Sequence, residues 1–314
     1  MRDLKLIVVL SENWTMTSSR DLKSLVRMAV EAEDAGADGV MISEHVVLGP
    51  DANARGVPAN PREYALPGNQ DPRTPWPASL TLLSAIAATT SRLRLIAGAI
   101  IAPLRHPLIL AKDLATLDLL SEGRLVVQPT VSWLRSEYEA LGVPFAERGE
   151  LLDEHLDAWH ALWRETPSTF HGHHYEFRDV YFEPKPYRPA GPILWFGGSS
   201  LHDKLVRRIV RHGQGFNPLG RPKPEDLERL ETAMSGAGRG MSELEMVGGT
   251  RAIFPDTSSV ADASKALASI PEQVSQGFST FCVKPSQFSD DPRRVGSLCR
   301  EIVDRLASLR GSDS

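Results

Sequence analysis

Glu44 and His45 are neighbouring side chains whose types and position suit proton chemistry. They follow residues 40–43, a short run rich in apolar and β-branched side chains that is predicted to form a buried strand. Imidazole gives or takes a proton near neutral pH, so His45 at the end of such a strand is a candidate general acid or base. The alternative is an ordinary polar strand end, with a surface carboxylate and a loop histidine.

A second group with possible chemistry is Gly197-Gly198-Ser199-Ser200, which follows one predicted strand and opens a predicted helix. Two glycines let successive backbone amides converge at a helix N-terminus, where the dipole favours an anion, so this is a candidate phosphate site. An ordinary tight turn with a serine cap is the alternative. Basic residues of the same helix could meet a polyanionic tail or form a solvated face: Lys204, Arg207, Arg208 and Arg211.

The composition favours a globular protein that acts on small molecules. Of the 314 residues, 41% are hydrophobic and 24% are charged, which is enough to bury a full core. The net charge of −5 argues against a nucleic-acid-binding or membrane-surface protein, for which a basic face is expected. The apolar run within residues 1–10 ends well short of the ~20 residues that span a bilayer, and we interpret it as the first strand.

Cysteine and histidine usage gives no indication of a metal site. Cys282 and Cys299 lie in different predicted elements, so neither a disulfide scaffold nor a thiolate site is expected, and a reducing cytoplasm fits. His171, His173 and His174 have no acidic partner at ligand spacing. A solvent-exposed hairpin explains these three histidines better than a metal ion.

Alternating strands and helices provide the frame that must position these residues. Besides the strands at residues 1–10 and 40–43, the sequence predicts strands at residues 93–101, 125–131, 193–196, near 215, 247–254 and 279–283. It predicts helices at residues 21–35, 78–90, 107–120, 133–141, 148–163, 201–212, 224–234, 260–270 and 292–309.

About eight strands, each followed by a helix, predict a single (β/α)8 TIM barrel domain over residues 1–314. A doubly wound open sheet is the alternative, but no G-x-G-x-x-G follows the first strand. Two insertions are expected, a long loop at residues 48–77 after strand 2 and an irregular segment at residues 170–189 between strands 4 and 5. Active sites of such barrels lie at the C-terminal ends of the strands, where Glu44 and His45 are expected.

Several segments, taken in their order and spacing, are similar to those of one known family. They are residues 38–45 (DGVMISEH), 93–95 (LRL), 103–112 (PLRHPLILAK), 115–124 (ATLDLLSEGR), 133–145 (WLRSEYEALGVPF), 148–149 (RG), 184–186 (PKP) and 195–198 (WFGG). Together they resemble the bacterial luciferase-like monooxygenase family of flavin and deazaflavin oxidoreductases. Within it the chain looks most like the branch that depends on coenzyme F420, an 8-hydroxy-5-deazaflavin.

The resemblance implies roles for the residues at the barrel mouth. His45 stands where the F420-dependent branch has a histidine beside the cofactor ring, which donates a proton or stabilises charge during hydride transfer. Glu44, at a position that is often Asp in relatives, would orient the histidine or contact the ring. Ala99 and Ile100 stand where the family has a strand bulge, often with a non-proline cis peptide, that supports the back of the ring.

One segment departs from the family pattern. After its fourth strand the family has a glycine-rich G-V-G-x-G run, whereas residues 128–132 here read QPTVS. Pro129 removes an amide donor and fixes φ, so a close approach of the cofactor to this backbone is not expected. The hydroxyl groups of Thr130 and Ser132 could supply hydrogen bonds in its place.

The remaining expected contacts are divided between cofactor and substrate. The resemblance reinforces the phosphate site proposed above, which gives Gly197, Gly198 and Ser199 as cofactor-binding residues. Trp133, an aromatic residue near a predicted strand end, is a further candidate for cofactor contact or could simply pack in the core. Aromatic side chains near predicted strand ends could form the substrate pocket, or each could simply pack in the core: Trp14, Trp76 and Phe216.

The leading functional hypothesis is an oxidoreductase that transfers a hydride between F420 and a carbonyl, an imine or an activated alkene, in either direction. An FMN-dependent monooxygenase that uses oxygen and a partner flavin reductase is the first alternative. A deazaflavin lacks the N5 through which reduced flavin reacts with oxygen, so the identity of the cofactor separates the two. A barrel that binds flavin or a metabolite without turnover is the second alternative. A cytoplasmic homodimer is expected.

Overall fold

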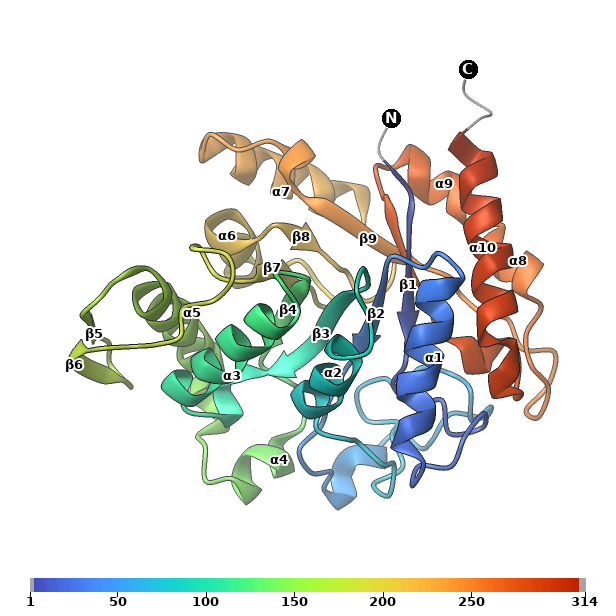
Figure 1. Ribbon diagram of the computed structural model, residues 1–314, viewed down its shortest axis with the longest axis horizontal. Helices are drawn as coiled ribbons and strands as arrows, with labels where there is room; N and C mark the ends of the chain where they lie inside the picture. The colour runs from blue at the N-terminus through green and yellow to red at the C-terminus, as the bar shows by residue number, and fades with distance from the viewer. Residues whose placement is uncertain (1–2, 311–314) are drawn as a thin grey trace.

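The structure is a computed structural model that describes residues 3–310. Within these residues, eight parallel strands form a closed barrel, which confirms the predicted (β/α)8 fold (Figure 1). Around the barrel the order is β1-β10-β9-β8-β7-β4-β3-β2. The barrel strands are β1 (Lys5–Val9), β2 (Gly39–Ile42), β3 (Arg94–Ile101), β4 (Leu125–Thr130), β7 (Ile193–Phe196), β8 (Gly215–Phe216), β9 (Glu245–Gly249) and β10 (Thr280–Val283).

Helices surround the barrel, and their starts follow from local sequence. Asp21 caps the first helix by accepting a hydrogen bond from Ser24 N–H, and Pro107 occupies the first turn of α3, where no amide donor is needed. The helices are α1 (Leu22–Asp34), α2 (Ser79–Ala87), α3 (Pro107–Leu120), α4 (Arg135–Ala140), α5 (Arg148–Arg164), α6 (Asp203–His212), α7 (Pro224–Gly236), α8 (Ala263–Leu267), α9 (Ile270–Ser275) and α10 (Val295–Arg310).

Alternation along the strands divides the apolar side chains into two layers. Leu6 and Val8 of β1 belong to the large layer between the strands and the helices. Ile7 and Val9 face the other way, into a smaller cluster that fills the barrel interior. The other buried members of this interior cluster are Met41, Ile96, Val126, Trp195 and Val247.

Three predicted elements differ from the structure. The segment at residues 170–189 is not wholly irregular, because β5 (Ser168–His171) and β6 (Glu176–Val180) pair as an antiparallel hairpin. The predicted strand at residues 247–254 is shifted, since β9 ends at Gly249. The predicted helix at residues 260–270 is two short helices, α8 and α9.

The C-terminal ends of the strands meet the loop at residues 48–77. In Figure 1 this light-blue segment and α4 lie beyond the arrowheads of β1 and β2. Apart from the 3-10 helix η1 (Pro50–Asn53), the loop contains no regular helix or strand among the described residues, as predicted. No helix in the described part of the chain is long and apolar enough to cross a bilayer.

Candidate active site

His45 lies three residues after the end of β2, at the end of the barrel where catalysis is expected. Its Nδ1 is 3.1 Å from Oε2 of Glu137, and its Nε2 is 3.4 Å from Nε2 of Gln70. All three side chains are buried, and that of Glu137 is 0% exposed. Because the three residues come from the end of β2, from α4 and from the loop at residues 48–77, only the fold brings them together.

Glu137 fixes the orientation of the His45 ring. Its Oε1 accepts a hydrogen bond of 2.5 Å from the backbone N–H of Val46, and its Oε2 accepts one of 3.4 Å from the hydroxyl of Ser132. An ionised carboxylate only accepts hydrogen bonds, so Nδ1 of His45 must donate to it. Nε2 is then the acceptor nitrogen, and Gln70 donates its amide N–H to it.

Two tryptophans hold the His45 ring from its edges. Trp76 contacts it with ring centroids 5.2 Å apart, and Trp133 does so at 6.0 Å, both in T-shaped geometry. The indole nitrogen of Trp76 is buried without a hydrogen-bond partner, and so is Oε1 of Gln70. Buried polar groups normally have partners, so these two atoms beside His45 are candidates for contacts with a bound molecule.

Glu44 binds neighbouring strand ends. Its Oε1 accepts hydrogen bonds from the backbone N–H of Ile101 at 3.0 Å and from Arg105 at 2.7 Å, while its Oε2 accepts from Ser79 at 2.7 Å and from Arg105 at 3.0 Å. These four bonds use the acceptor capacity of the carboxylate. Glu44 is therefore a positioning residue that ties β2 to β3 and α2, and it has no free oxygen for the expected contact with a cofactor ring.

The bulge in β3 forms where the family resemblance places it. The pairing with β4 shifts register between Gly98 and Ile100, and the cis peptide bond joins Gly98 to Ala99. Ala99 remains partly exposed, so it can contact a bound molecule. Ile100 is 0% exposed and packs in the layer under the helices, which corrects its expected contact with the cofactor.

The segment that departs from the family pattern is held by its own hydrogen bonds. Pro129 continues β4 opposite Ile100, and Oε1 of Gln128 accepts a hydrogen bond of 2.8 Å from the side chain of Asn217. The hydroxyl of Thr130 accepts from the backbone N–H of Ser132 at 3.4 Å. Both hydroxyls are partly exposed, but that of Ser132 also donates to the carboxylate that holds His45.

The two glycines after β7 differ in how much space surrounds them. A Cβ on Gly197 would lie 1.9 Å from the carbonyl oxygen of Asn217, so packing alone requires glycine there. A Cβ on Gly198 would meet only ordinary contacts, the nearest at 3.4 Å. The helix α6 begins at Asp203 with His202 as its cap, so the prediction that Gly197 to Ser200 open a helix is wrong.

Two of the four basic residues of α6 are engaged with its neighbour α5. Arg208 is buried and binds the carboxylate of Asp153 at 2.6 Å, and Arg211 binds Asp157 at 2.7 Å. Lys204 and Arg207 are exposed and stay candidates for contact with a polyanionic tail. The exposed Ser199 stays a candidate for anion contact without the support of a helix N-terminus.

The aromatic residues expected at the pocket separate into two groups. Trp76 and Trp133 reach His45, as described above. Phe216 is 1% exposed and belongs to the core layer between the strands and the helices. It therefore does not line the mouth, contrary to the prediction. Trp14 is partly buried against the same layer, and its indole nitrogen is buried without a partner.

The loop at residues 48–77 covers the strand ends through contacts on several sides. Asn60 donates to the carbonyl oxygens of Asp256 and Ser259, and Arg62 forms an ion pair with Asp290 at 2.5 Å. Sequence patterns did not identify the residues that this loop and α4 bring to the mouth. Gln70 lies in no motif, and Glu137 lies in the family-like segment 133–145 without a role assigned to it; the pairing of both with His45 depends on distant segments. A fully buried lysine, Lys284, was also missed, although its place at the end of β10 is a signal that could have found it.

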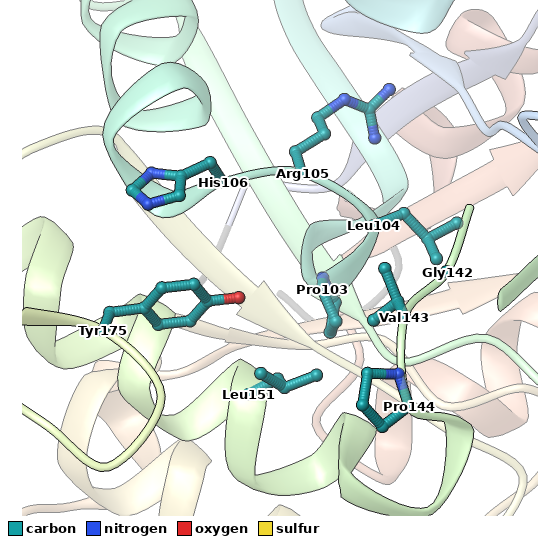
Figure 2. Close-up of a pocket in the computed structure, with 9 residues that line it drawn as sticks. All are labelled: Pro103, Leu104, Arg105, His106, Gly142, Val143, Pro144, Leu151 and Tyr175. Atoms are coloured by element: carbon teal, nitrogen blue, oxygen red, sulfur yellow. The ribbon is translucent and has the colours of Figure 1, made fainter.

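A separate hollow lies away from His45. It has a volume of about 250 Å³, and Figure 2 shows Tyr175, Leu151 and Pro103 around it while the guanidinium of Arg105 points away. The other lining residues are Leu104, His106, Gly142, Val143 and Pro144. His171, His173 and His174 belong to the β5–β6 hairpin, as predicted, and no cluster of three or more candidate ligands able to hold a metal ion is present within residues 3–310.

Comparisons with known proteins identify the family. The model of luciferase-like monooxygenases matches residues 5–295, across nearly the whole barrel. The chain belongs to this family. Among its relatives, an uncharacterised protein of Mycobacterium tuberculosis is 35% identical over 184 residues, which cover 56% of this chain and 62% of that protein. The match thus spans less than two thirds of that relative. An FMNH2-dependent dimethylsulfone monooxygenase of Pseudomonas putida is 34% identical over 125 residues, 39% of this chain and 34% of that enzyme.

Several solved structures share the fold. An F420-dependent secondary alcohol dehydrogenase superposes with a TM-score of 0.73 at 15% identity, covering 97% of this chain and 99% of that one. The F420-dependent tetrahydromethanopterin reductase of Methanopyrus kandleri gives 0.71 at 13% identity, with 97% and 100% covered. The EDTA monooxygenase of Chelativorans sp. BNC1 gives 0.68 at 15% identity, with 99% and 95% covered. F420-dependent enzymes and a monooxygenase therefore share this fold.

The residues at the mouth fit a flavin or deazaflavin. The partly exposed bulge at Ala99 offers a small side chain, and Trp76 and Trp133 offer apolar walls. The unpartnered buried atoms of Gln70 and Trp76 offer an acceptor and a donor for the polar edges of such a ring.

Proposed function

We propose that this protein is an oxidoreductase that transfers a hydride between coenzyme F420 and a small organic substrate, as a single barrel domain. The observation that carries the proposal is the buried Glu137–His45–Gln70 chain of hydrogen bonds at the C-terminal ends of the strands. A bound deazaflavin would supply the hydride donor or acceptor at its C5. F420-dependent enzymes of known structure share this fold over nearly their whole length, so the barrel is of a kind that holds this cofactor.

His45 accepts or donates the proton that accompanies the hydride. Because Nδ1 donates to Glu137, Nε2 has the lone pair that can take a proton from a substrate hydroxyl or amine. The buried carboxylate of Glu137 stabilises the positive charge that His45 then acquires. In the reverse direction the same nitrogen returns the proton to a carbonyl, imine or activated alkene. Gln70 must yield its hydrogen bond to the substrate during this step.

Trp76 and Trp133 keep water away from His45, and Glu44 keeps β2 in register with β3. Glu44 does so by accepting the backbone N–H of Ile101 in β3 at 3.0 Å, and its ion pair with Arg105 fixes the carboxylate in that position. We assign it no proton transfer. The geometry built around His45 also makes a barrel without catalytic turnover the weaker alternative.

An FMN-dependent monooxygenase is the second candidate function. It is favoured by the 34% identity to the FMNH2-dependent dimethylsulfone monooxygenase, which exceeds the identity to the F420-dependent enzymes described above. In that case a partner reductase would supply reduced FMN. A homodimer is proposed for either function.

The test of the proposed function is the His45→Asn variant. Asparagine keeps a polar side chain but cannot transfer a proton near neutral pH, so single-turnover hydride transfer should fall by about 10²–10⁴-fold. The assay follows deazaflavin absorbance with a substrate found by screening alcohols, ketones, imines and activated alkenes. Cofactor affinity and thermal stability are measured in parallel. A folded, cofactor-binding variant that transfers hydride within a fewfold of the parent would show that His45 is only a wall of the pocket.

A further inference from the structure

The hollow next to the β5–β6 hairpin is built from separate parts of the chain. The segment between β3 and α3 forms one wall, the loop after α4 forms another, and Leu151 of α5 and Tyr175 of the hairpin turn complete it (Figure 2). Its volume of about 250 Å³ approaches that of known ligand pockets, which begin near roughly 300 Å³, whereas one water occupies about 30 Å³ of liquid. The hollow is therefore large enough for a small organic molecule.

Most of the side chains around the hollow are apolar. They are those of Pro103, Leu104, Val143, Pro144 and Leu151. Water held against such walls finds few hydrogen-bond partners, so an apolar group displaces it at a gain in free energy. The lining therefore favours a ligand with an apolar or aromatic body.

Tyr175 directs a free hydroxyl into this hollow. In Figure 2 the hydroxyl points toward Pro103, and it forms no hydrogen bond with any other described residue. Burial and the charge of Glu154 raise the pKa of Tyr175, so the hydroxyl keeps its proton at neutral pH and is a donor. A half-buried donor without a partner favours a ligand that brings an acceptor.

Contacts with α5 and with the start of α3 hold Tyr175 in this orientation. Its backbone N–H donates to Glu154 at 3.1 Å, and its ring makes T-shaped contacts with His155 at 5.1 Å and with His106 at 5.3 Å between centroids. His155 is itself buried, and both of its ring nitrogens lie within 2.8 Å of backbone carbonyl oxygens. The hydroxyl is thus in place before a ligand binds, which lowers the entropy cost of binding.

The two basic residues of the lining offer no free positive charge to the hollow. The guanidinium of Arg105 points away from it in Figure 2 and binds the carboxylate of Glu44 at 2.7 Å and 3.0 Å. Nδ1 of His106 accepts a hydrogen bond from the backbone N–H of Leu108, which requires the neutral ring. An anion would therefore find no counter-charge here, and an uncharged ligand fits best.

We propose that this hollow is a second binding site, which takes a small uncharged molecule with an apolar or aromatic body and one hydrogen-bond acceptor. The body lies against Pro103, Val143 and Leu151, and the acceptor receives a hydrogen bond from the hydroxyl of Tyr175. Small ethers and esters have these features. The site goes beyond the proposed function and does not depend on it, because neither His45 nor the cofactor takes part in binding.

Two probes of nearly equal size test the site by fluorine-19 NMR titration of the purified full chain. 4-Fluoroanisole has an ether oxygen where 1-ethyl-4-fluorobenzene has a methylene group. Tyr175→Phe removes only the hydroxyl. It should weaken the binding of 4-fluoroanisole about two- to tenfold, which is the worth of one hydrogen bond, and leave the binding of 1-ethyl-4-fluorobenzene unchanged.

Tyr181→Phe is the matched control. It makes the same substitution directly after β6, at a side chain that is 76% exposed, and it should leave both affinities unchanged. Val143→Trp should fill the hollow and abolish the binding of both probes, with circular dichroism to confirm the fold. If that variant does not fold, Tyr175→Phe decides alone.

Three results would overturn the proposal. The first is an absence of saturable binding of either probe to the parent. The second is equal binding of 4-fluoroanisole by the parent and by Tyr175→Phe. The third is binding that His45→Asn weakens and Tyr175→Phe does not, because the probe would then occupy the barrel mouth.

Discussion

Replacing Glu137 with Gln should reverse the tautomer of His45. The amide oxygen of Gln can still accept the 2.5 Å hydrogen bond from Val46 N–H, but its NH2 group then faces Nδ1 of His45 at the 3.1 Å position. Two donors cannot share that contact, so Nδ1 must become the acceptor and the ring proton must move to Nε2. The side chain of Gln70 must then turn its unpartnered Oε1 toward Nε2.

The consequences of this substitution have calculable sizes. The parent loses hydrogen bonds to a buried carboxylate, which are worth about 1.5–3 kcal/mol each, but the amide restores most of them, so stability should fall by about 1–3 kcal/mol in total. Hydride transfer should fall by about 10²–10⁴-fold, because Nε2 then holds a proton and cannot accept one. The comparable change in a serine protease triad, from Asp to Asn, also acts through the wrong tautomer.

Nitrogen-15 NMR of histidine-labelled protein measures the tautomer directly. The chain has 9 histidines, and a spectrum of His45→Asn identifies the signals of His45 by their loss. In the parent, Nδ1 should have the shift of a protonated nitrogen and Nε2 that of an unprotonated one, and Glu137→Gln should exchange them. Glu137→Asp serves as the control that keeps the carboxylate. Identical His45 tautomers in the parent and in Glu137→Gln would refute the role assigned to Glu137.

Two further predictions concern the glycines and the base of the barrel. Gly198→Val should fold normally and weaken cofactor binding about tenfold or more, because the side chain blocks contacts with the backbone. Gly197→Ala should instead lower the thermal midpoint of unfolding. Unchanged cofactor affinity in Gly198→Val would place the phosphate elsewhere. Burial acts to raise the pKa of Glu245, but the hydrogen bonds and charge of Arg94 outweigh it and lower that pKa to about 2 from 4.5. A lowered pKa contributes stability above pH 4.5 that is lost as the pH falls toward 2. Urea unfolding should therefore show Glu245→Gln to be about 3 kcal/mol less stable than the parent at pH 7, and this difference should shrink in acid. A difference in stability that does not depend on pH would contradict this.

The sequence predicts the barrel because its signals are local. Strand and helix periods, short connections and the expected bulge in β3 all depend on residues close in the chain, and the structure agrees with them. The start of α6 differs because its cap is His202, a residue type that capping rules do not single out, whereas the sequence predicted that the helix opens directly after Gly197 to Ser200.

The site is predicted less completely because its contacts join distant segments. His45 is found from its place after a buried strand, but its partner Glu137 is 92 positions away. Glu44 has the same local signal as His45, and only its ion pair with Arg105, 61 positions away, shows that it is a positioning residue.

The central claim is that the mouth around His45 binds a deazaflavin for hydride transfer. The most direct measurement is a fluorescence titration of the purified cofactor-free protein with F420 and, in parallel, with FMN. Saturable binding of F420, tighter than that of FMN, is predicted. Micromolar binding of FMN with no detectable binding of F420 would contradict the claim and establish the monooxygenase alternative as the function to pursue.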